Sequence, residues 1–482
     1  MKRRTALKNI GATVSAGLIL PSFISSCKED EVKPEVDYAG TVAIIGAGAA
    51  GLYAADILST KGIKVKLFEA SDALGGRVRT VKTIDNSPIE SDYPIELGAE
   101  RIIGTDGKWA TMIDELKIPV VDIDTLGKES YIINSKFTSL NEASGQSEFL
   151  NAETFYHSFS SRLSSNGSVE SEVMSSGIST SLSPLVNSWI GNRFGSSDKR
   201  VGAKPVAETF SQLTRNKLER TLRSNPMQDV LVSRFSKIVP FVELNTVIKN
   251  INYSSGKVLL SGEKKTAGSS EPFTAEVDKV IITVPVSILK SGDITFTPAL
   301  PQTITNAMIN IAMDASIRLA LDFKQNFWGS DVSYILGGET APEYFSGGIG
   351  RSQLNKTLSI TINGPKAEEL SSKSDEQIVE DVLAELDKAF DGKGTANVRR
   401  DDSDKPIYML RNWGNQPYIK GGISYVKPGG SIEDRNAIST PVQSLVFFAG
   451  EATHPIEAGT VNGALLSAER VATEVVTSIV GA

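Results

Sequence analysis

Short apolar runs alternate with helix-like segments along most of this chain. The run Val42 to Ile45 predicts a buried strand, and the alanine-rich stretch Ala49 to Thr60, closed by Gly62, predicts a helix. A second apolar run, Val65 to Phe68, predicts the next strand. Together they predict a βαβ unit and an α/β fold.

Further strand patterns follow in the second half of the chain. Residues 239–260 alternate as strands, and residues 277–284 form a buried-type strand that Pro285 stops. Residues 445–449 form one more apolar run, whereas the polar residues 264–271 predict a loop. Several strands of the body therefore come from distant parts of the sequence.

Helical spacing dominates the remaining segments. Residues 105–227 predict a mostly helical insertion with serine-rich mobile loops and carry no recognisable chemical motif. Residues 375–390 predict an amphipathic helix, and apolar residues recur at helical spacing from Val461 onward. Residues 318–328 predict a strand of a second domain.

Length and charge limit the possible functions. A chain of 482 residues predicts two or three domains, and its net charge of −7 argues against nucleic acid as a partner. His157 and His454 are its only histidines, too few for a histidine-rich metal site, and no metal site is predicted. For His454 both a catalytic role and a purely local hydrogen bond stay open.

The first 40 residues read as a targeting segment. Arg3-Arg4, an apolar stretch from Ile10 to Ile24 and the single cysteine, Cys27, resemble a twin-arginine signal that ends in a lipobox, with residues 28–40 as a tether. We expect residues 1–27 to direct export to the periplasm or cell surface, with a membrane attachment only through an N-terminal lipid anchor. A plain secretory signal with an incidental cysteine is the alternative.

The segment Gly46-Ala47-Gly48-Ala49-Ala50-Gly51 contains the pattern Gly-x-Gly-x-x-Gly between the first strand and the first helix. Such a turn cradles a dinucleotide pyrophosphate at a helix N-terminus, where free N–H groups and the positive end of the helix dipole face the anion. Glu69 follows at the end of the second strand, where an acidic residue binds ribose hydroxyls. The alternative for Glu69 is a surface carboxylate.

Three segments together resemble the FAD-dependent amine oxidase family, which includes monoamine, polyamine and L-amino-acid oxidases. The first runs from Glu69 through Gly75-Gly76-Arg77, the second is Glu96-Leu97-Gly98-Ala99, and the third is Gly450-Glu451 with the later Gly459 to Ala464. The resemblance implies a discontinuous Rossmann-like FAD domain of residues 41–104, 227–295 and 408–482. A mixed α+β substrate domain would comprise residues 105–226 and 296–407, with ligands in the crevice between the two domains.

The resemblance also implies where FAD binds. Glu69 would take the adenosine ribose, Arg77 would approach the phosphates, and the helix N-terminus at Val461 would face the flavin pyrimidine and stabilise the reduced ring. The full set of implied cofactor-binding residues is Gly46, Gly48, Ala49, Ala50, Gly51, Glu69, Ala70, Gly75, Gly76, Arg77, Gly98, Ala99, Glu100, Arg101, Val247, Gly450, Glu451, Thr460 and Val461.

The chain departs from the family at three places. Arg318 stands ten residues before Trp328, where the family has a catalytic lysine that reaches flavin N5 through water, and this puts rapid reaction with oxygen in doubt. Ile423 replaces the cysteine that attaches flavin in monoamine oxidases, so the FAD should be non-covalent. Ser424 and Thr460 replace the two tyrosines of an aromatic cage, which weakens a monoamine-oxidase-like preference.

Arg101 is the second candidate catalytic residue. L-amino-acid oxidases resemble this chain in having an arginine there, which clamps the substrate carboxylate through two parallel hydrogen bonds. The alternative is that Arg101 forms an ion pair with a nearby carboxylate such as Glu100 or Glu96, or faces solvent. The sequence leaves both open.

The resemblance implies an oxidase that converts the C–N bond of an amine or L-α-amino acid to an imine by hydride transfer to flavin N5, with O₂ reduced to H₂O₂. Two alternatives stay open, a desaturase or porphyrinogen-oxidase-like enzyme acting on C–C bonds and a non-catalytic flavin lipoprotein. The sequence does not identify the substrate, the electron acceptor or the oligomeric state.

Overall fold

The structure, a computed structural model, describes residues 35–81, 88–213, 216 and 218–481. The predicted signal and most of the predicted tether lie outside these residues, so export and lipid anchoring stay predictions. Within the described residues, no helix combines the length and the apolar character that crossing a bilayer requires. The same residues contain no cluster of histidine, cysteine and acidic side chains suited to a metal ion.

A five-stranded parallel sheet forms the first layer of the molecule. Its strand order is β10-β2-β1-β14-β23, and every neighbouring pair is parallel. The strands come from three distant stretches of sequence, which confirms the predicted α/β class with a discontinuous Rossmann-like domain. Their bounds are β1 (Thr41–Ile45), β2 (Lys64–Phe68), β10 (Val242–Glu243), β14 (Lys279–Ile282) and β23 (Val446–Phe448).

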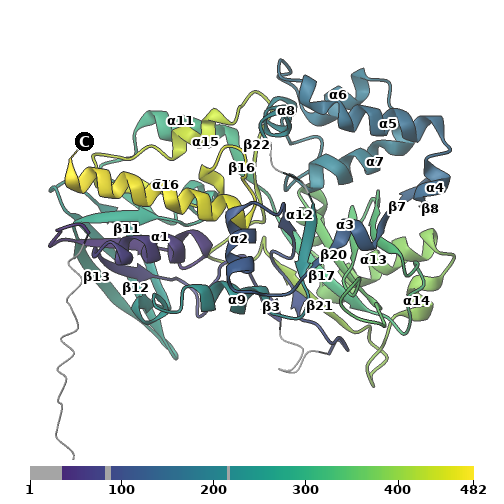
Figure 1. The fold of residues 1–482 in the computed structure, drawn as a ribbon, viewed down its shortest axis with the longest axis horizontal. Coiled ribbons are helices and arrows are strands. Elements are labelled where there is room, and N and C mark those ends of the chain that lie inside the picture. Colours follow the sequence, from purple (N-terminus) through teal and green to yellow (C-terminus); the bar gives the residue numbers. More distant parts are fainter. Residues whose placement is uncertain (1–34, 82–87, 214–215, 217, 482) are drawn as a thin grey trace, which may run out of the picture.

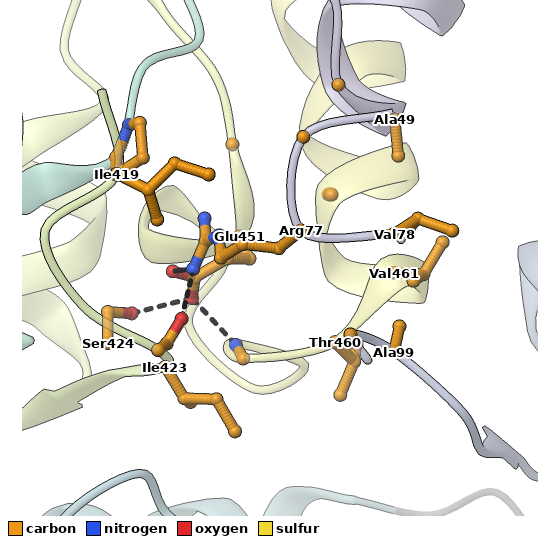
Figure 2. A pocket seen from close by; sticks show the side chains of 18 of the residues that line it. Ala49, Arg77, Val78, Ala99, Ile419, Ile423, Ser424, Glu451, Thr460 and Val461 are labelled. Carbon is orange, nitrogen blue, oxygen red and sulfur yellow. Dashed lines mark hydrogen bonds and ion pairs between the residues drawn. The ribbon is translucent and has the colours of Figure 1, made fainter. Parts of the chain in front are cut away.

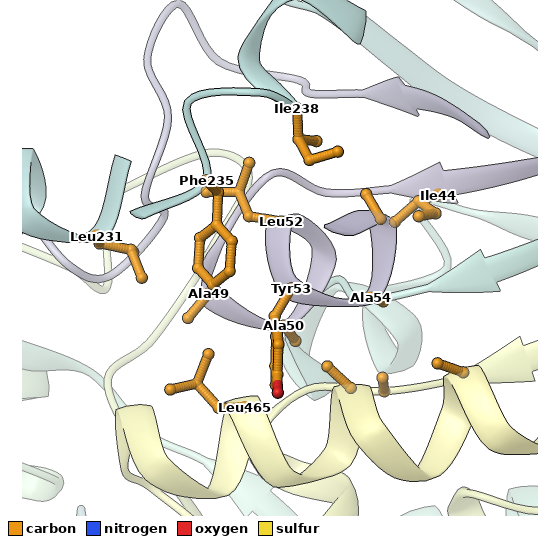
Figure 3. Close-up of a cluster of buried hydrophobic side chains, with 14 of the residues drawn as sticks. Ile44, Ala49, Ala50, Leu52, Tyr53, Ala54, Leu231, Phe235, Ile238 and Leu465 are labelled. Carbon is orange, nitrogen blue, oxygen red and sulfur yellow. The ribbon is translucent and has the colours of Figure 1, made fainter. Parts of the chain in front are cut away.

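Two helices pack against this sheet and against each other. Helix α1 (Ala49–Thr60) and helix α16 (Val461–Val480) begin where the sequence predicts. Figure 3 shows Ala50 and Tyr53 of α1 directed toward Leu465 of α16. This apolar contact joins the first and last α-helices of the described residues and fixes both helix N-termini near the carboxyl ends of the parallel strands.

A twisted antiparallel hairpin lies beside the parallel sheet. Strands β12 (Val258–Thr266) and β13 (Ser269–Val277) pair in register over their whole length. The predicted loop at residues 264–271 is therefore wrong, because only Ala267 and Gly268 form the turn and the polar residues continue both strands. Solvent-facing strands tolerate such residues. Strands β11 (Thr246–Asn252) and β15 (Thr295–Thr297) complete this sheet.

A seven-stranded mixed sheet forms the second half of the molecule (Figure 1). Strand β17 (Ser316–Asp322) is shorter than the predicted strand, because Phe327 and Trp328 leave the sheet and pack in an aromatic cluster with Phe323. The predicted amphipathic helix is α13 (Asp375–Ala389). The other strands are β7 (Lys128–Ile133), β8 (Lys136–Ser139), β18 (Val332–Leu336), β19 (Glu343–Ser346), β20 (Thr357–Asn363) and β21 (Tyr408–Asn412).

The segment 105–226 contains helices together with strands, so its prediction as mostly helical is right only in part. Helices α5 (Ser147–His157), α6 (Val169–Ser175) and α8 (Ala203–Gln212) gather at one end of the mixed sheet (Figure 1). Strands β7 and β8 of the same segment join that sheet. The segment also contains α2 (Lys108–Glu115), β6 (Val120–Asp122), α7 (Ser183–Val186), the π-helix η3 (Asn187–Asn192) and β9 (Glu219–Leu222).

Four shorter elements outside this segment also contribute to the description of the site. They are α9 (Met227–Arg234), β22 (Ser424–Val426), α15 (Glu433–Ile438) and η5 (Glu451–Thr453).

Candidate functional site

One cavity of about 1240 Å³ runs from the glycine-rich turn after β1 to the helices of the segment 105–226. It lies where the parallel sheet meets the mixed sheet, at the carboxyl ends of the parallel strands, which is the usual ligand position in such folds. All predicted site residues except Gly51 line it. The structure thus gathers residues from positions 45 to 464 into one continuous site.

The three glycines of the turn have different surroundings. A Cβ on Gly46, whose φ is +106°, would lie 2.5 Å from Thr283 Oγ1, and a Cβ on Gly51 would lie 1.9 Å from the Gly46 carbonyl oxygen. A Cβ on Gly48 would meet only the Gly75 carbonyl oxygen, at 3.9 Å, and Gly48 lines the cavity. Gly51 is therefore required by strand–helix packing and does not line the cavity, and its contribution to pyrophosphate binding stays a prediction.

Glu69 is buried and fastens the turn. Its Oε2 accepts a hydrogen bond from the Ala47 N–H at 2.8 Å, and its Oε1 accepts one from the Ser71 N–H at 2.9 Å. The reading of Glu69 as a surface carboxylate is therefore wrong, since only 9% of the residue is exposed. Its contact with a ribose stays a prediction.

Glu451 connects three loops at the centre of the cavity (Figure 2). Its Oε1 accepts a hydrogen bond from Arg77 Nη1 at 2.9 Å, and its Oε2 accepts bonds from Ser424 Oγ at 2.6 Å and the Gly459 N–H at 2.8 Å. Burial by itself raises the pKa of Glu451, but the guanidiniums of Arg77 and Arg435 outweigh it, so this pKa lies below its ordinary value. The carboxylate is ionised and orders the surrounding loops.

The N-terminus of α16 opens into the same part of the cavity. Thr460 caps the helix, since its side-chain oxygen accepts a hydrogen bond from the Gly463 N–H at 2.9 Å. Thr460 and Val461 both line the cavity, so the positive end of a 20-residue helix faces it. Ile423, at the place of the family's attachment cysteine, lines the cavity beside them.

Gly98 and Ala99 have different structural roles. A Cβ on Gly98 would lie 2.0 Å from the Arg77 carbonyl oxygen, so this glycine permits the close packing of two backbone segments. Ala99 presents its small side chain to the cavity, as Figure 2 shows. Leu97, just before them, accepts a hydrogen bond at its carbonyl from Trp413 Nε1 at 2.7 Å.

Arg318 is almost fully buried in β17. Its guanidinium donates hydrogen bonds to Glu100 and Thr361, and Nη2 donates to Ser359 Oγ at 3.2 Å. The ion pair with Glu100 neutralises the permanent charge within the protein and holds the side chain against the sheet. Arg318 lines the cavity, as predicted, but its position relative to flavin N5 stays a prediction.

Arg101 takes part in a buried network of ion pairs. Its Nη2 lies 2.5 Å from Glu343 Oε1, and its Nε lies 3.9 Å from Glu219 Oε2. The expected alternative partners, Glu100 and Glu96, form no ion pair with it among the described residues. Its Nη1 is buried and has no hydrogen-bond partner in the described structure, so one donor of this guanidinium stays available inside the cavity wall.

Sequence reasoning missed the other members of this network. Arg193 Nη1 lies 3.2 Å from Glu219 Oε1, and Arg193 Nε lies 3.7 Å from Glu343 Oε2. Burial raises the pKa of Glu343, but Arg101, Arg193 and the more distant Arg318 outweigh it and bring this pKa below its ordinary value. Arg193 and Glu219 belong to the segment 105–226, which contributes to the site although it carries no recognisable chemical motif. No motif or spacing in the sequence marks either residue.

Two further arginines line the cavity. The Nε atoms of Arg79 and Arg411 are buried without a hydrogen-bond partner in the described structure. Burial lowers the pKa of Arg411 and the neighbouring charge of Arg79 lowers it further, while Asp72 acts in the opposite direction. Together with the open space at Gly48 and the two helix N-termini, these unused donors fit an anionic dinucleotide such as FAD.

His454 is excluded from this site by its contacts. Its Nδ1 accepts hydrogen bonds from the Glu457 N–H at 2.9 Å and the Ile456 N–H at 3.3 Å, and it does not line the cavity. Burial lowers its pKa. The purely local role that the sequence left open is therefore confirmed.

Comparison with known proteins agrees with this geometry. Residues 240–476 match the family model described as flavin containing amine oxidoreductase, and residues 44–116 match that of an NAD(P)-binding Rossmann-like domain. Lysine-specific histone demethylase 2 of Homo sapiens is 26% identical over 95% of this chain, and polyamine oxidase 4 of Oryza sativa subsp. japonica is 23% identical over 94% of it. The alignments cover 56% and 90% of those two proteins, so the chain spans about half the length of the demethylase.

Solved structures share the fold. Putrescine oxidase bound to putrescine has a TM-score of 0.73 at 19% identity, covering 91% of this chain and 99% of that chain. Cyclohexylamine oxidase from Brevibacterium oxydans has a TM-score of 0.72 at 18% identity, covering 92% and 100%. At this identity the likeness shows the architecture alone.

Proposed function

Because this chain belongs to the family of flavin-containing amine oxidoreductases, we propose that it oxidises the C–N bond of an amine or an L-α-amino acid to an imine. One observation carries the proposal: a single cavity joins a dinucleotide cradle to a buried network of arginines and glutamates. When bound, FAD supplies the acceptor for the hydride that leaves the α-carbon. O₂, reduced to H₂O₂, is the proposed final acceptor.

The chain itself would bind and orient the reactants. Glu451 and the N-terminus of α16 would fix the dinucleotide, and the ionised Glu343 would accept a hydrogen bond from the amine N–H and direct the α-carbon. Arg101 and Arg193 face Glu219 and Glu343, and Glu129 lies 4.0 Å from Arg193 Nη2. A neutral amine adds no charge to this network and would therefore enter without creating an unpaired buried charge.

Anaerobic reduction of the purified holoenzyme tests this function. A panel of amines, amino acids and polyamines is added without oxygen, and the flavin absorbance is followed. Bleaching by at least one C–N substrate, followed by peroxide release when air is admitted, is expected. Bleaching only by C–C substrates would assign the chain to the desaturases, and no bleaching at all would leave it a flavin-binding protein without this activity.

Precipitation with acid should leave the yellow colour in the supernatant, because Ile423 offers no attachment atom. Among the described residues that line the cavity there is no cysteine and no histidine. Absorbance at the flavin maximum in supernatant and pellet checks this. Colour retained in the pellet would contradict the prediction and point to one of the lining tyrosines, Tyr156 or Tyr418.

The Arg101→Ala enzyme should lose about 10- to 150-fold in kcat/KM for L-α-amino acids, roughly 1.5 to 3 kcal/mol, and little for the decarboxylated amines. The reason is that Nη1 of Arg101 is the free donor for a substrate carboxylate. Glu219→Gln is the control, because it removes the partner that lies 3.9 Å from Arg101 Nε and keeps the guanidinium. If Glu219→Gln removes amino-acid turnover as strongly as Arg101→Ala, or if amines suffer equally from Arg101→Ala, the clamp is wrong.

The Arg318→Lys enzyme should be reoxidised by O₂ faster than the parent, while its reductive half-reaction changes less. Lysine ends in a compact, strongly hydrated ammonium in place of the larger planar guanidinium of arginine. The space that this change leaves would admit a water molecule beside the flavin ring. Stopped-flow absorbance of both half-reactions measures the effect. Unchanged rates in both would show that Arg318 serves only its ion pair with Glu100.

A further inference from the structure

The end of the cavity away from the glycine-rich turn is formed by four aromatic rings, Tyr156, Trp189, Phe194 and Phe210, which we call the aromatic wall. All four line the cavity. Tyr156 lies 5.4 Å from Trp189 and 5.7 Å from Phe210, and Phe194 lies 5.9 Å from Phe210, measured between ring centroids. These spacings are those of mutually packed aromatic rings, so the four form one continuous surface.

One ring of the aromatic wall belongs to a π-helix that is hydrogen-bonded to the mixed sheet. Trp189 lies within η3 (Asn187–Asn192), and the last residue of η3 is tied to β20 of the mixed sheet. The side-chain Oδ1 of Asn192 accepts a hydrogen bond from the Asn363 N–H at 2.9 Å, and Asn363 Nδ2 donates to the Asn192 carbonyl at 2.7 Å. Single-turn π-helices inside helical segments occur frequently at functional sites, because the wider turn redirects side chains.

The wall carries no free charge. Among the described lining residues between positions 189 and 213, Arg193 is the one charged side chain, and Glu219 and Glu343 already neutralise it. The other lining residues there are apolar or neutral: Asn192, Val201, Pro205, Val206, Thr209 and Leu213. Glu129 lies 4.0 Å from Arg193 Nη2 but does not line the cavity. A second ammonium group placed at this end would therefore find no carboxylate among the described lining residues between positions 189 and 213.

We propose that the substrate is a monoamine with an aryl or cycloalkyl group, and that this group packs against the aromatic wall while the amine reaches the network of Arg101 and Glu343. The inference rests on the proposed amine oxidation. Three of the four rings are only half-buried and all four line the cavity, so an apolar group of the substrate can cover ring surface there. The wall therefore selects the group attached to the α-carbon, and the ion-pair network orients the nitrogen.

Anaerobic stopped-flow reduction of the holoenzyme by 2-phenylethylamine, ethylamine and 1,4-diaminobutane tests the inference. The amine concentration at half-maximal reduction rate should be about 10- to 100-fold lower for 2-phenylethylamine than for ethylamine. Phe194→Ala and Phe210→Ala should remove most of this advantage and leave ethylamine unchanged. Phe241→Ala, which alters an aromatic side chain that is 53% exposed outside the cavity, is the matched control and should change nothing.

Two further measurements keep the test decisive. Phe210→Leu preserves an apolar side chain of similar size and should retain part of the preference if Phe210→Ala folds poorly. Binding of 2-phenylethanol, which has no amine, is followed by tryptophan fluorescence and should weaken in the Ala variants. If no amine reduces the flavin but 2-phenylethanol still binds the wall, the proposed function fails and the apolar site stands.

Other outcomes overturn the inference alone. Equal half-saturation for ethylamine and 2-phenylethylamine would show that the wall does not contact substrate. Tightest binding of 1,4-diaminobutane, lost in Phe194→Ala and Phe210→Ala, would show that the rings bind a second ammonium by cation–π attraction. Either result leaves amine oxidation itself intact.

Discussion

The Gly48→Val protein is expected to purify without flavin and without oxidase activity. A side chain at this position would project into the cavity between the turn and Gly75, where the pyrophosphate of a dinucleotide is expected. The backbone of Gly48 has φ −79°, which valine can adopt, and the nearest protein atom to a Cβ is 3.9 Å away. Loss of flavin should therefore occur in a folded protein. Absorbance spectra and circular dichroism check the two statements separately.

The matched control is Gly145→Val, in an exposed turn where a Cβ would lie 3.4 Å from the nearest atom, the Glu142 carbonyl oxygen. That variant should retain a full complement of FAD. A yellow Gly48→Val protein would contradict the placement of the pyrophosphate. A Gly48→Val protein that lacks native circular dichroism would instead show that the turn tolerates no side chain even without ligand.

Replacing Glu451 by glutamine should destabilise the protein by about 3 to 5 kcal/mol and release FAD. The substitution keeps the shape of the side chain but leaves Arg77 and Arg435 without their shared buried counter-charge, and breaking a buried pair from one side has this cost. The three loops that Glu451 joins would then lose their common anchor. Urea unfolding of the apoprotein and fluorescence titration with FAD measure the two effects.

Glu276→Gln provides the control for this prediction. Glu276 is exposed on β13 and pairs with Lys257 at 3.4 Å across solvent-facing strands, so its substitution should change the unfolding free energy by no more than about 0.5 kcal/mol. If Glu451→Gln proves as mild as Glu276→Gln, the central role given to Glu451 is wrong.

Local sequence patterns predicted several elements around the parallel sheet, where the glycine-rich turn lies. The limits of α1 and the start of α16 were readable because a glycine-rich turn, an alanine-rich stretch and the helical spacing of apolar residues are local patterns. The hairpin of β12 and β13 escaped prediction because exposed strands carry polar residues that resemble a loop. Gly51 does not line the cavity, because its place is where the first helix packs against the Gly46 carbonyl.

By itself the sequence determined the glycine-rich turn, the α/β class and the resemblance to the amine oxidase family, because each motif that carries them consists of residues close together in the chain. Only the tertiary structure decided the partners of Arg101 and Arg318, which pair with Glu343 and Glu100 across 242 and 218 positions. It alone brought Arg193, Glu219 and the aromatic wall to the cavity. Ion pairs and ring contacts of this kind depend on how distant elements pack. The periodic pattern of apolar residues along the sequence does not indicate which element will face a given side chain.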